Sequence, residues 1–107
     1  YAGYHLRHII IRGTGYNTLP ANAFTSSGWY SIALIDTEYI ADNALTSGLT
    51  GLLNLSLPYL DTIKASSSAF SFDTSKVQLH LRGNDYSNAD KTNNKWKDKS
   101  WKAIKQY

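Results

Sequence analysis

Leu49-Thr50-Gly51-Leu52-Leu53-Asn54-Leu55-Ser56-Leu57 is the stretch that decides the fold class. Leucine favours helices, yet the last leucines alternate with polar residues, as in a strand with one buried face. We interpret the stretch as helical. If it is extended instead, the alternative is an all-β sandwich.

Strand and helix signals precede this stretch. His5–Arg12 contains three consecutive isoleucines, and this unbroken apolar run indicates a central strand buried on both faces. Trp29–Ile35 has the aromatic and β-branched composition of a second strand. Apolar residues between positions 40 and 45 then recur at helical spacing, and Gly48 is a suitable helix end.

A strand is also expected after the leucine-rich stretch. Val77–Arg82 alternates cleanly, which places Val77, Leu79 and Leu81 on the core side. Strands on both sides of a helical middle predict an α/β (α+β) fold. We expect a small single-domain sandwich with an antiparallel or mixed sheet and helices packed on one face.

Length and composition indicate one exported domain. The 107 residues suit a single domain over 1–107, with a basic amphipathic segment at 91–107 that holds six lysines. The absence of cysteine excludes a disulfide scaffold and thiolate metal sites. A chain without methionine that begins at Tyr1 is expected to be processed from a precursor, and its many aromatic and hydroxyl residues favour an extracellular location.

Two short segments share one pattern, in which Arg-Gly follows an apolar strand and Tyr comes four residues after the Arg. They are residues 9–16 and 79–86. If the two strands are neighbours, Arg12, Tyr16, Arg82 and Tyr86 form one cationic aromatic patch for sugars, phosphates or carboxylates. The simpler alternative is two convenient turns. Because the similarity extends no further, it does not by itself indicate duplicated halves or a repeat architecture.

Residues 95–107 are predicted to form an amphipathic helix. Trp96 and Trp101 fall on its apolar side. The opposite side carries four lysines, Lys95, Lys99, Lys102 and Lys105. Three roles fit such a helix. Its apolar side can complete the core, the helix can bind anionic lipid, or its aromatic residues can anchor a partner chain.

Catalytic signals are weak. The histidines lack the spacing of a metal site, and no phosphate-binding loop or nucleophile elbow occurs, so no cofactor or metal is expected. His8 and His80, each near arginines, are the one pair able to serve as acid and base on a phosphodiester.

These observations favour a small exported cationic protein that acts non-catalytically at a target surface, either cell-wall polysaccharide or membrane. A toxin or toxin subunit is one form of this function. The first alternative is an assembly subunit of a filament, coat or complex, whose partner is another protein chain. The second is a phosphodiesterase or nuclease that uses His8 and His80. Nucleic acid is a weaker partner, because the basic charge is local.

Overall fold

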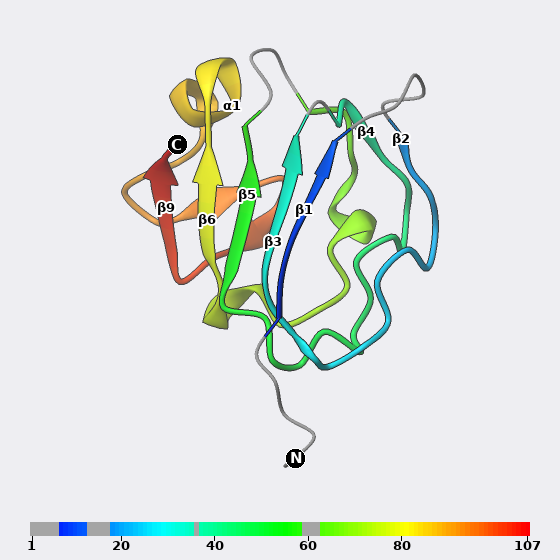
Figure 1. Ribbon diagram of the computed structural model, residues 1–107. Coiled ribbons are helices and arrows are strands. Elements are labelled where there is room, and N and C mark those ends of the chain that lie inside the picture. Colours follow the sequence, from blue (N-terminus) through cyan, green and yellow to red (C-terminus); the bar gives the residue numbers. More distant parts are fainter. Residues whose placement is uncertain (1–6, 13–17, 36, 59–62) are drawn as a thin grey trace.

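A five-stranded parallel sheet organises the chain. The computed structural model describes residues 7–12, 18–35, 37–58 and 63–107. Every pair of neighbouring strands in this sheet is parallel, and the order of the strands across the sheet is their order along the chain (Figure 1). These strands are β1 (Arg7–Arg12), β3 (Trp29–Ile35), β5 (Asn54–Leu57), β6 (Gln78–Leu81) and β9 (Ala103–Gln106).

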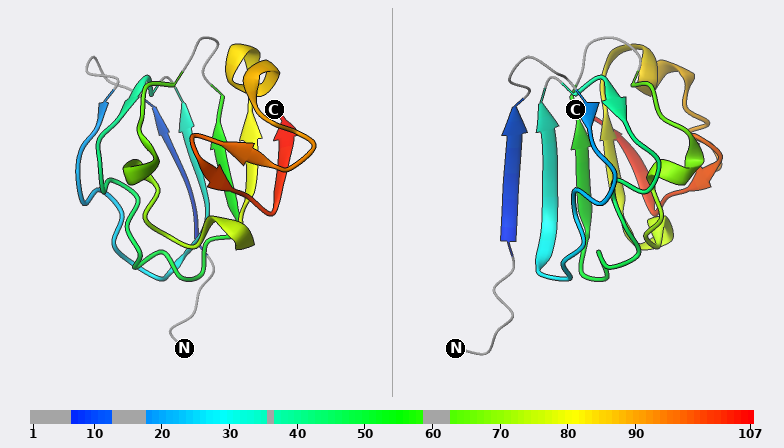
Figure 2. Two further views of the ribbon diagram at one scale, coloured as in Figure 1. Left: turned by 180° about the vertical axis from the view of Figure 1, so that it is seen from behind. Right: turned by 90° about the vertical axis from the view of Figure 1, so that its right-hand side faces the viewer.

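A second layer of extended chain faces the sheet. β2 (Thr18–Leu19) pairs in parallel with β4 (Tyr39–Ile40), and an isolated parallel bridge joins Tyr39 to Lys64. Further parallel bridges join Phe24, Leu45 and Phe70 in the same direction. Each turn of the chain therefore passes through the sheet, crosses to the second layer and returns one strand further along (Figure 2). This arrangement is a solenoid of stacked coils.

The coils repeat at a nearly constant length. Residues paired across the sheet lie 22 to 25 positions apart in the sequence. In the second layer, the tripeptides Asn22-Ala23-Phe24, Asn43-Ala44-Leu45 and Ser68-Ala69-Phe70 occupy equivalent places. The chain therefore has a repeat architecture, which the short Arg-Gly-Tyr similarity did not indicate.

Asparagine marks the bend in two of these coils. Asn22 and Asn43 have φ values of 58° and 60°, a left-handed conformation that asparagine tolerates better than most residues. The Asn43 side-chain amide donates to Asn22 Oδ1 at 3.1 Å. The same side chain thus shapes the bend and connects neighbouring coils.

The core lies between the two layers. Inward side chains from successive sheet strands stack in one row, and the second layer supplies large side chains from the other side. Val77, Leu79 and Leu81 are at most 1% exposed, which confirms the side of β6 predicted to face the core. The inward row consists of Ile9, Ile32, Leu55, Leu79 and Ile104.

The predicted α/β fold class is wrong. The leucine-rich stretch ends in β5, and the segment expected to be helical over 40–45 instead leaves β4 at Ile40, turns at Asn43 and forms a bridge at Leu45. Its backbone amides bond to neighbouring coils, as when Leu45 N–H donates to the carbonyl of Ala69 at 3.1 Å. Tertiary pairing has therefore overridden local helix propensity. Gly48 does not end a helix; a side chain there would overlap the carbonyl oxygen of Thr25 in the preceding coil.

Helices are minor within the described residues. The one α-helix found there, α1 (Gly83–Asn88), has 6 residues, and short 3-10 turns form η1 (Ser67–Ala69) and η2 (Thr74–Lys76). None of the helices in the described part of the chain has the length and apolar character needed to cross a bilayer. The structure is closer to the all-β alternative, but its sheet is parallel and its coils are stacked, unlike an antiparallel sandwich.

The C-terminal segment is a hairpin and a strand, so the predicted helix over 95–107 is wrong. β7 (Lys95–Trp96) pairs antiparallel with β8 (Lys99–Ser100), and the two residues between them, Lys97 and Asp98, have φ values of 52° and 57°. Two consecutive positive φ values define the tight turn that a two-residue hairpin requires. A helix cannot contain that turn.

The hairpin closes the core at this end. Trp96 and Trp101 are 6% and 4% exposed, and the Trp101 indole N–H donates to the Trp96 carbonyl at 3.2 Å. Both rings pack against Phe70, at centroid distances of 5.6 and 5.5 Å. The core-completing role that was one of the expectations for this segment is confirmed for the two tryptophans.

Candidate binding surface at the basic end

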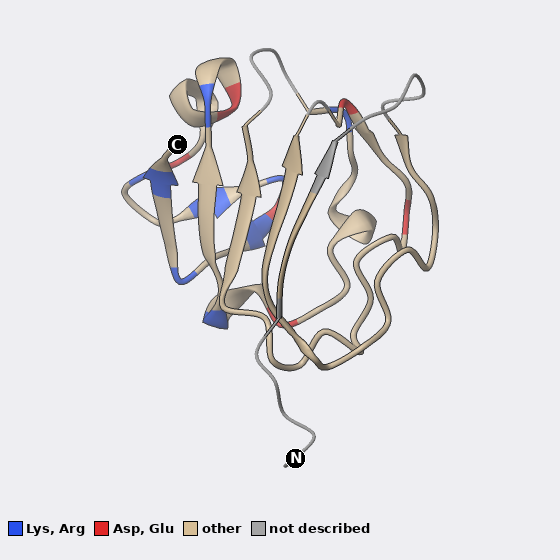
Figure 3. Ribbon diagram, in the orientation of Figure 1, with Lys and Arg blue, Asp and Glu red and all other residues tan. Residues whose placement is uncertain are grey.

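Positive charge is segregated along the chain. Residues 13–63 contain no Lys or Arg and four acidic residues, whereas residues 64–107 contain nine basic and four acidic residues. In a solenoid, order along the chain is also order in space. A middle segment without Lys or Arg therefore separates β1, whose sequence contains Arg7 and Arg12, from a lysine-rich C-terminal end. The blue segments in Figure 3 gather over β6 to β9.

We define the basic end as the five cationic residues that follow β6 and whose side chains make no described hydrogen bond, ion pair or contact with an aromatic ring. The ion pairs found among the described residues are Lys64 with Glu38 at 3.5 Å and Lys76 with Asp73 at 3.9 Å. Lys99 is half-buried and the other members are exposed. The basic end consists of Arg82, Lys95, Lys99, Lys102 and Lys105.

Two other lysines of this region have local structural roles. Lys91 Nζ donates to the carbonyls of Tyr86 and Ala89, at 2.9 and 3.3 Å, at the end of helix α1. It also lies 4.7 Å from the centroid of the Tyr86 ring. Lys97 lies 5.5 Å from the centroid of the Trp96 ring. The cation contact of the Tyr86 ring is therefore made by Lys91 of the same chain.

The outward face of the sheet, which faces the viewer in Figure 1, carries two rows of side chains. One row begins at His8 and the other at Ile10. The second row is apolar or small on the first strands and ends in imidazole and ammonium groups. The rows are His8, Ser31, Asn54 and Gln78, and Ile10, Ala33, Ser56, His80 and Lys105.

The strands that carry the two Arg-Gly-Tyr segments are not neighbours, which was the condition for one patch. β1 and β6 are separated by β3 and β5 and so lie about 14 Å apart, at three strand spacings. Arg82 is exposed at the end of β6. Arg12 ends β1, but its side chain and the whole of Tyr16 lie outside the described residues.

The two histidines are likewise held apart. His8 on β1 and His80 on β6 belong to different outward rows and are separated by β3 and β5. Each has its own partner: His8 Nδ1 lies 2.7 Å from Ser31 Oγ, and His80 Nε2 lies 3.3 Å from Asn54 Oδ1. They do not form the acid and base pair that the sequence suggested. The described residues also contain no group of three His, Asp or Glu placed to hold a metal ion.

His80 has a perturbed environment. Burial lowers the pKa of its imidazole below the usual value, and the positive charge of Lys105 lowers it further. The imidazole is therefore neutral at neutral pH. His80 and Lys105 together carry one positive charge, which matters for the ligand they can accept.

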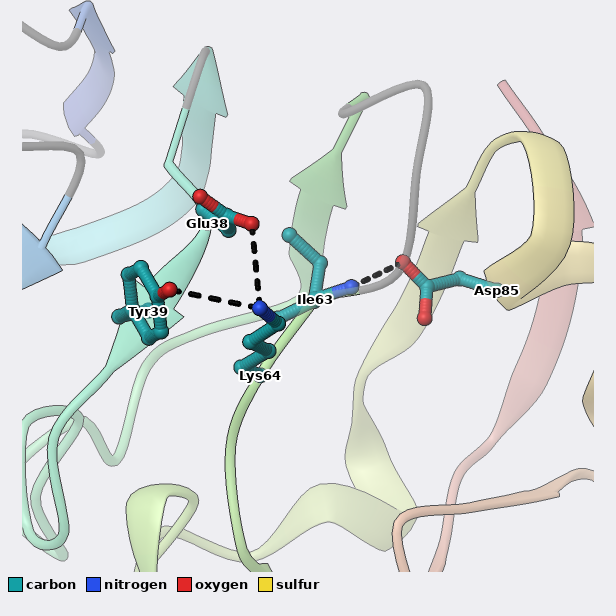
Figure 4. A network of polar contacts seen from close by, with 5 residues as sticks. All are labelled: Glu38, Tyr39, Ile63, Lys64 and Asp85. Carbon is teal, nitrogen blue, oxygen red and sulfur yellow. Dashed lines mark hydrogen bonds and ion pairs between the residues drawn. The ribbon is translucent and has the colours of Figure 1, made fainter.

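A buried carboxylate connects the elements behind this surface. Asp85, in α1, is 2% exposed and accepts a hydrogen bond from Ile63 N–H at 2.8 Å (Figure 4). Burial raises the pKa of this carboxyl, while the hydrogen bonds from Ile63 and the Trp96 side chain and the charge of Lys97 act in the opposite direction. Asp85 thus links α1 to the third coil and to the closing hairpin. No sequence pattern indicates this role for Asp85, because an acidic residue next to a turn is ordinarily exposed.

A second network in Figure 4 lies on the second layer. Lys64 Nζ donates to Tyr39 Oη at 3.3 Å and pairs with Glu38. These contacts connect β4 to the next coil at the same position as the bridge between Tyr39 and Lys64. They are exposed, so their main effect is on coil register.

Comparisons with known proteins gave no relatives from which a function could be transferred. No protein-family model matches the chain, and no curated protein or solved structure is significantly similar to it. The functional argument therefore depends on the geometry and charge of the surface described above.

Proposed function

We propose that this chain is a non-catalytic binding protein that attaches to an anionic polysaccharide through its basic end. The observation that carries the proposal is the charge segregation: nine basic residues after position 63 and none between 13 and 63. A rigid solenoid presents Arg82 and the free lysines at fixed spacing, which suits a polymer with repeating negative charges.

The position of the tryptophans favours polysaccharide over membrane as the target. An interfacial helix inserts aromatic side chains into the lipid headgroup region. Here Trp96 and Trp101 are buried in the core and the segment is not a helix. The exposed lysines remain available for long-range attraction to a hydrated anionic polymer. We keep an exported location as part of this proposal, supported by composition.

The experiment compares two variants of equal net charge. In the first variant, Lys102 and Lys105 become Gln. In the second, Ser47 and Thr50, two exposed residues of the 13–63 segment that lacks Lys and Arg, become Glu. Binding to an immobilised polyuronate is measured at low and high salt. We expect the lysine variant to lose at least tenfold in affinity and the control less than threefold. Equal losses would show that net charge alone matters and would reject the basic end as the site.

Self-assembly is a second candidate function, favoured by a different observation. β1 is an edge strand in the described structure, and its Ile10 side chain is 55% exposed. Edge strands with apolar side chains and unpaired backbone groups can pair with another chain. Sedimentation or light scattering distinguishes this function from polysaccharide binding, because an assembly protein forms stable oligomers without added ligand.

A further inference from the structure

Five polar side chains gather on the outward face where the sheet meets the basic end. In the register of the sheet, Asn54 lies beside Gln78, Ser56 beside His80, and His80 beside Lys105. Neighbouring strands are about 4.8 Å apart, so the group spans about 10 Å from β5 to β9. We call these residues the His80 cluster.

One hydrogen bond orients the imidazole in this cluster. His80 Nε2 lies 3.3 Å from Asn54 Oδ1. An amide oxygen only accepts, so this contact assigns the proton of the neutral ring to Nε2 and leaves Nδ1 as an acceptor. The lowered pKa of His80 is consistent with a neutral ring. The cluster therefore offers an oriented acceptor and not a second cation.

The remaining groups are available to a ligand. Among the described contacts, the side chains of Ser56, Gln78 and Lys105 have no hydrogen-bond or ion-pair partner. Ser56 and Gln78 are half-buried and Lys105 is exposed. Together they supply a hydroxyl, an amide and one ammonium around the oriented imidazole.

We propose that the His80 cluster is a subsite for one sugar unit that carries a single carboxylate beside free hydroxyl groups. Lys105 pairs with the carboxylate, and His80 Nδ1 accepts a hydrogen bond from a hydroxyl. Gln78 and Ser56 bond to a second hydroxyl. This inference rests on the proposed function and specifies a carboxylate-bearing sugar as the unit of the polysaccharide that is bound.

The other end of the same face gives an internal comparison. His8 is also on the outward face and also bonded, but its neighbour across the sheet is Ser31, whereas His80 lies between Ser56 and Lys105. The row that contains His8 therefore has no lysine beside the imidazole. A uronic acid should engage His80 and leave His8 unchanged.

The test uses a short oligogalacturonide, which is too small to span the whole basic end, and a neutral oligosaccharide of the same length. Affinity is measured by calorimetry for the wild type, for Lys105→Gln and for the control Lys76→Gln, an exposed lysine of η2 outside the basic end. We expect Lys105→Gln to weaken oligogalacturonide binding at least tenfold and Lys76→Gln less than twofold. In NMR spectra, the His80 ring resonances should shift on titration while those of His8 remain unchanged.

The outcomes separate this inference from the proposed function. Binding of the long polyuronate with unchanged oligomer affinity in Lys105→Gln, or shifts at His8 equal to those at His80, overturns the subsite and leaves the proposed function standing. Equal affinity for the neutral oligomer, or tighter binding of a sulfated one, overturns the carboxylate assignment. No binding of long polyuronate by the wild type overturns both.

Discussion

The two ends of the solenoid differ in the side chains that surround their edge strands. Within the described residues, β1 and β9 are the two edge strands of the sheet, and an edge strand can pair with another chain. At the β9 end, the hairpin places Trp96 and Trp101 over the core, and Lys105 projects from the edge strand. At the β1 end, the described edge strand carries three isoleucines, of which Ile10 is largely exposed.

This difference separates stability from recognition. The C-terminal end is closed by aromatic packing and is surrounded by unpaired lysines, so its edge strand is shielded from pairing and its surface is cationic. The N-terminal end has apolar side chains on its edge strand, which suits contact with another chain. The same coil geometry therefore supports two kinds of surface.

The largest expected effect comes from breaking the closed end. Trp101→Ala should lower the free energy of unfolding by about 3 to 5 kcal/mol, because it leaves a cavity beside Phe70, Phe72 and Trp96. Urea denaturation monitored by circular dichroism measures the loss. Tyr107→Ala, at a side chain 55% exposed, is the control and should change stability by less than about 0.5 kcal/mol. If Trp101→Ala changed the free energy of unfolding as little as Tyr107→Ala, the hairpin would not be closing the core.

A smaller effect is expected at the carboxylate that ties the hairpin to the third coil. Asp85→Ala leaves the Ile63 N–H without its partner and should cost about 1 to 3 kcal/mol. Asp85→Asn keeps an oxygen acceptor and removes the charge.

The direction of the Asp85 pKa shift predicts how the effect of Asp85→Asn on the free energy of unfolding changes with pH. The folded-state pKa of Asp85 is raised by burial, so its contribution favours the folded state below the unfolded carboxyl pKa and is lost as pH rises through the folded value. Relative to wild type, Asp85→Asn should therefore be more stable at neutral pH than at acidic pH, in urea titrations across pH 3 to 7 at intervals of about one unit. The opposite trend would show that the hydrogen bonds outweigh desolvation.

The smallest effect on stability is expected at the open end. Ile10→Lys changes an outward side chain that is already 55% exposed, so the free energy of unfolding should shift by less than about 0.5 kcal/mol. If β1 is an assembly edge, light scattering should show oligomers for the wild type and monomers for this variant. A monomeric wild type at high concentration would remove self-assembly as the second candidate function.

The sequence predicts individual strands well and their arrangement poorly. The strand at Trp29–Ile35 and the inward side of β6 follow from composition and alternation, which are local properties. The isoleucine run was expected to be a central strand buried on both faces, which is wrong: β1 lies at the edge and Ile10 is exposed. Hydrophobicity alone does not reveal how many neighbours a strand has.

The repeat was missed for a related reason. The Asn-Ala-Phe, Asn-Ala-Leu and Ser-Ala-Phe tripeptides at 22–24, 43–45 and 68–70 are visible in the sequence, but they are short and unevenly spaced. Their common role is a bend and an inward aromatic or aliphatic side chain in the second layer. The longer Arg-Gly-Tyr pattern occurs on β1 and β6, which are not neighbours in the sheet.

In the candidate site too, some features follow from the sequence and others only from the tertiary structure. The excess of lysine after position 63 is a property of the sequence, and the solenoid converts it directly into a basic end because its order in space follows the chain. The assignment of Trp96 and Trp101 to a ligand contact depended on a helix, and the hairpin turn buried them in the core. The meeting of Asn54, His80 and Lys105 arises only from sheet pairing across 24 and 25 residues.

The sequence by itself determined which residues alternate between core and surface, where the positive charge accumulates and which residues can adopt tight bends, because these depend on side-chain chemistry and local backbone preference. Only the tertiary structure decided that Asn54–Leu57 is a strand and that the second layer is not helical, because their backbone groups pair with other coils. It also decided that the closing tryptophans face inward, since a hairpin turn at Lys97 and Asp98 directs them toward Phe70.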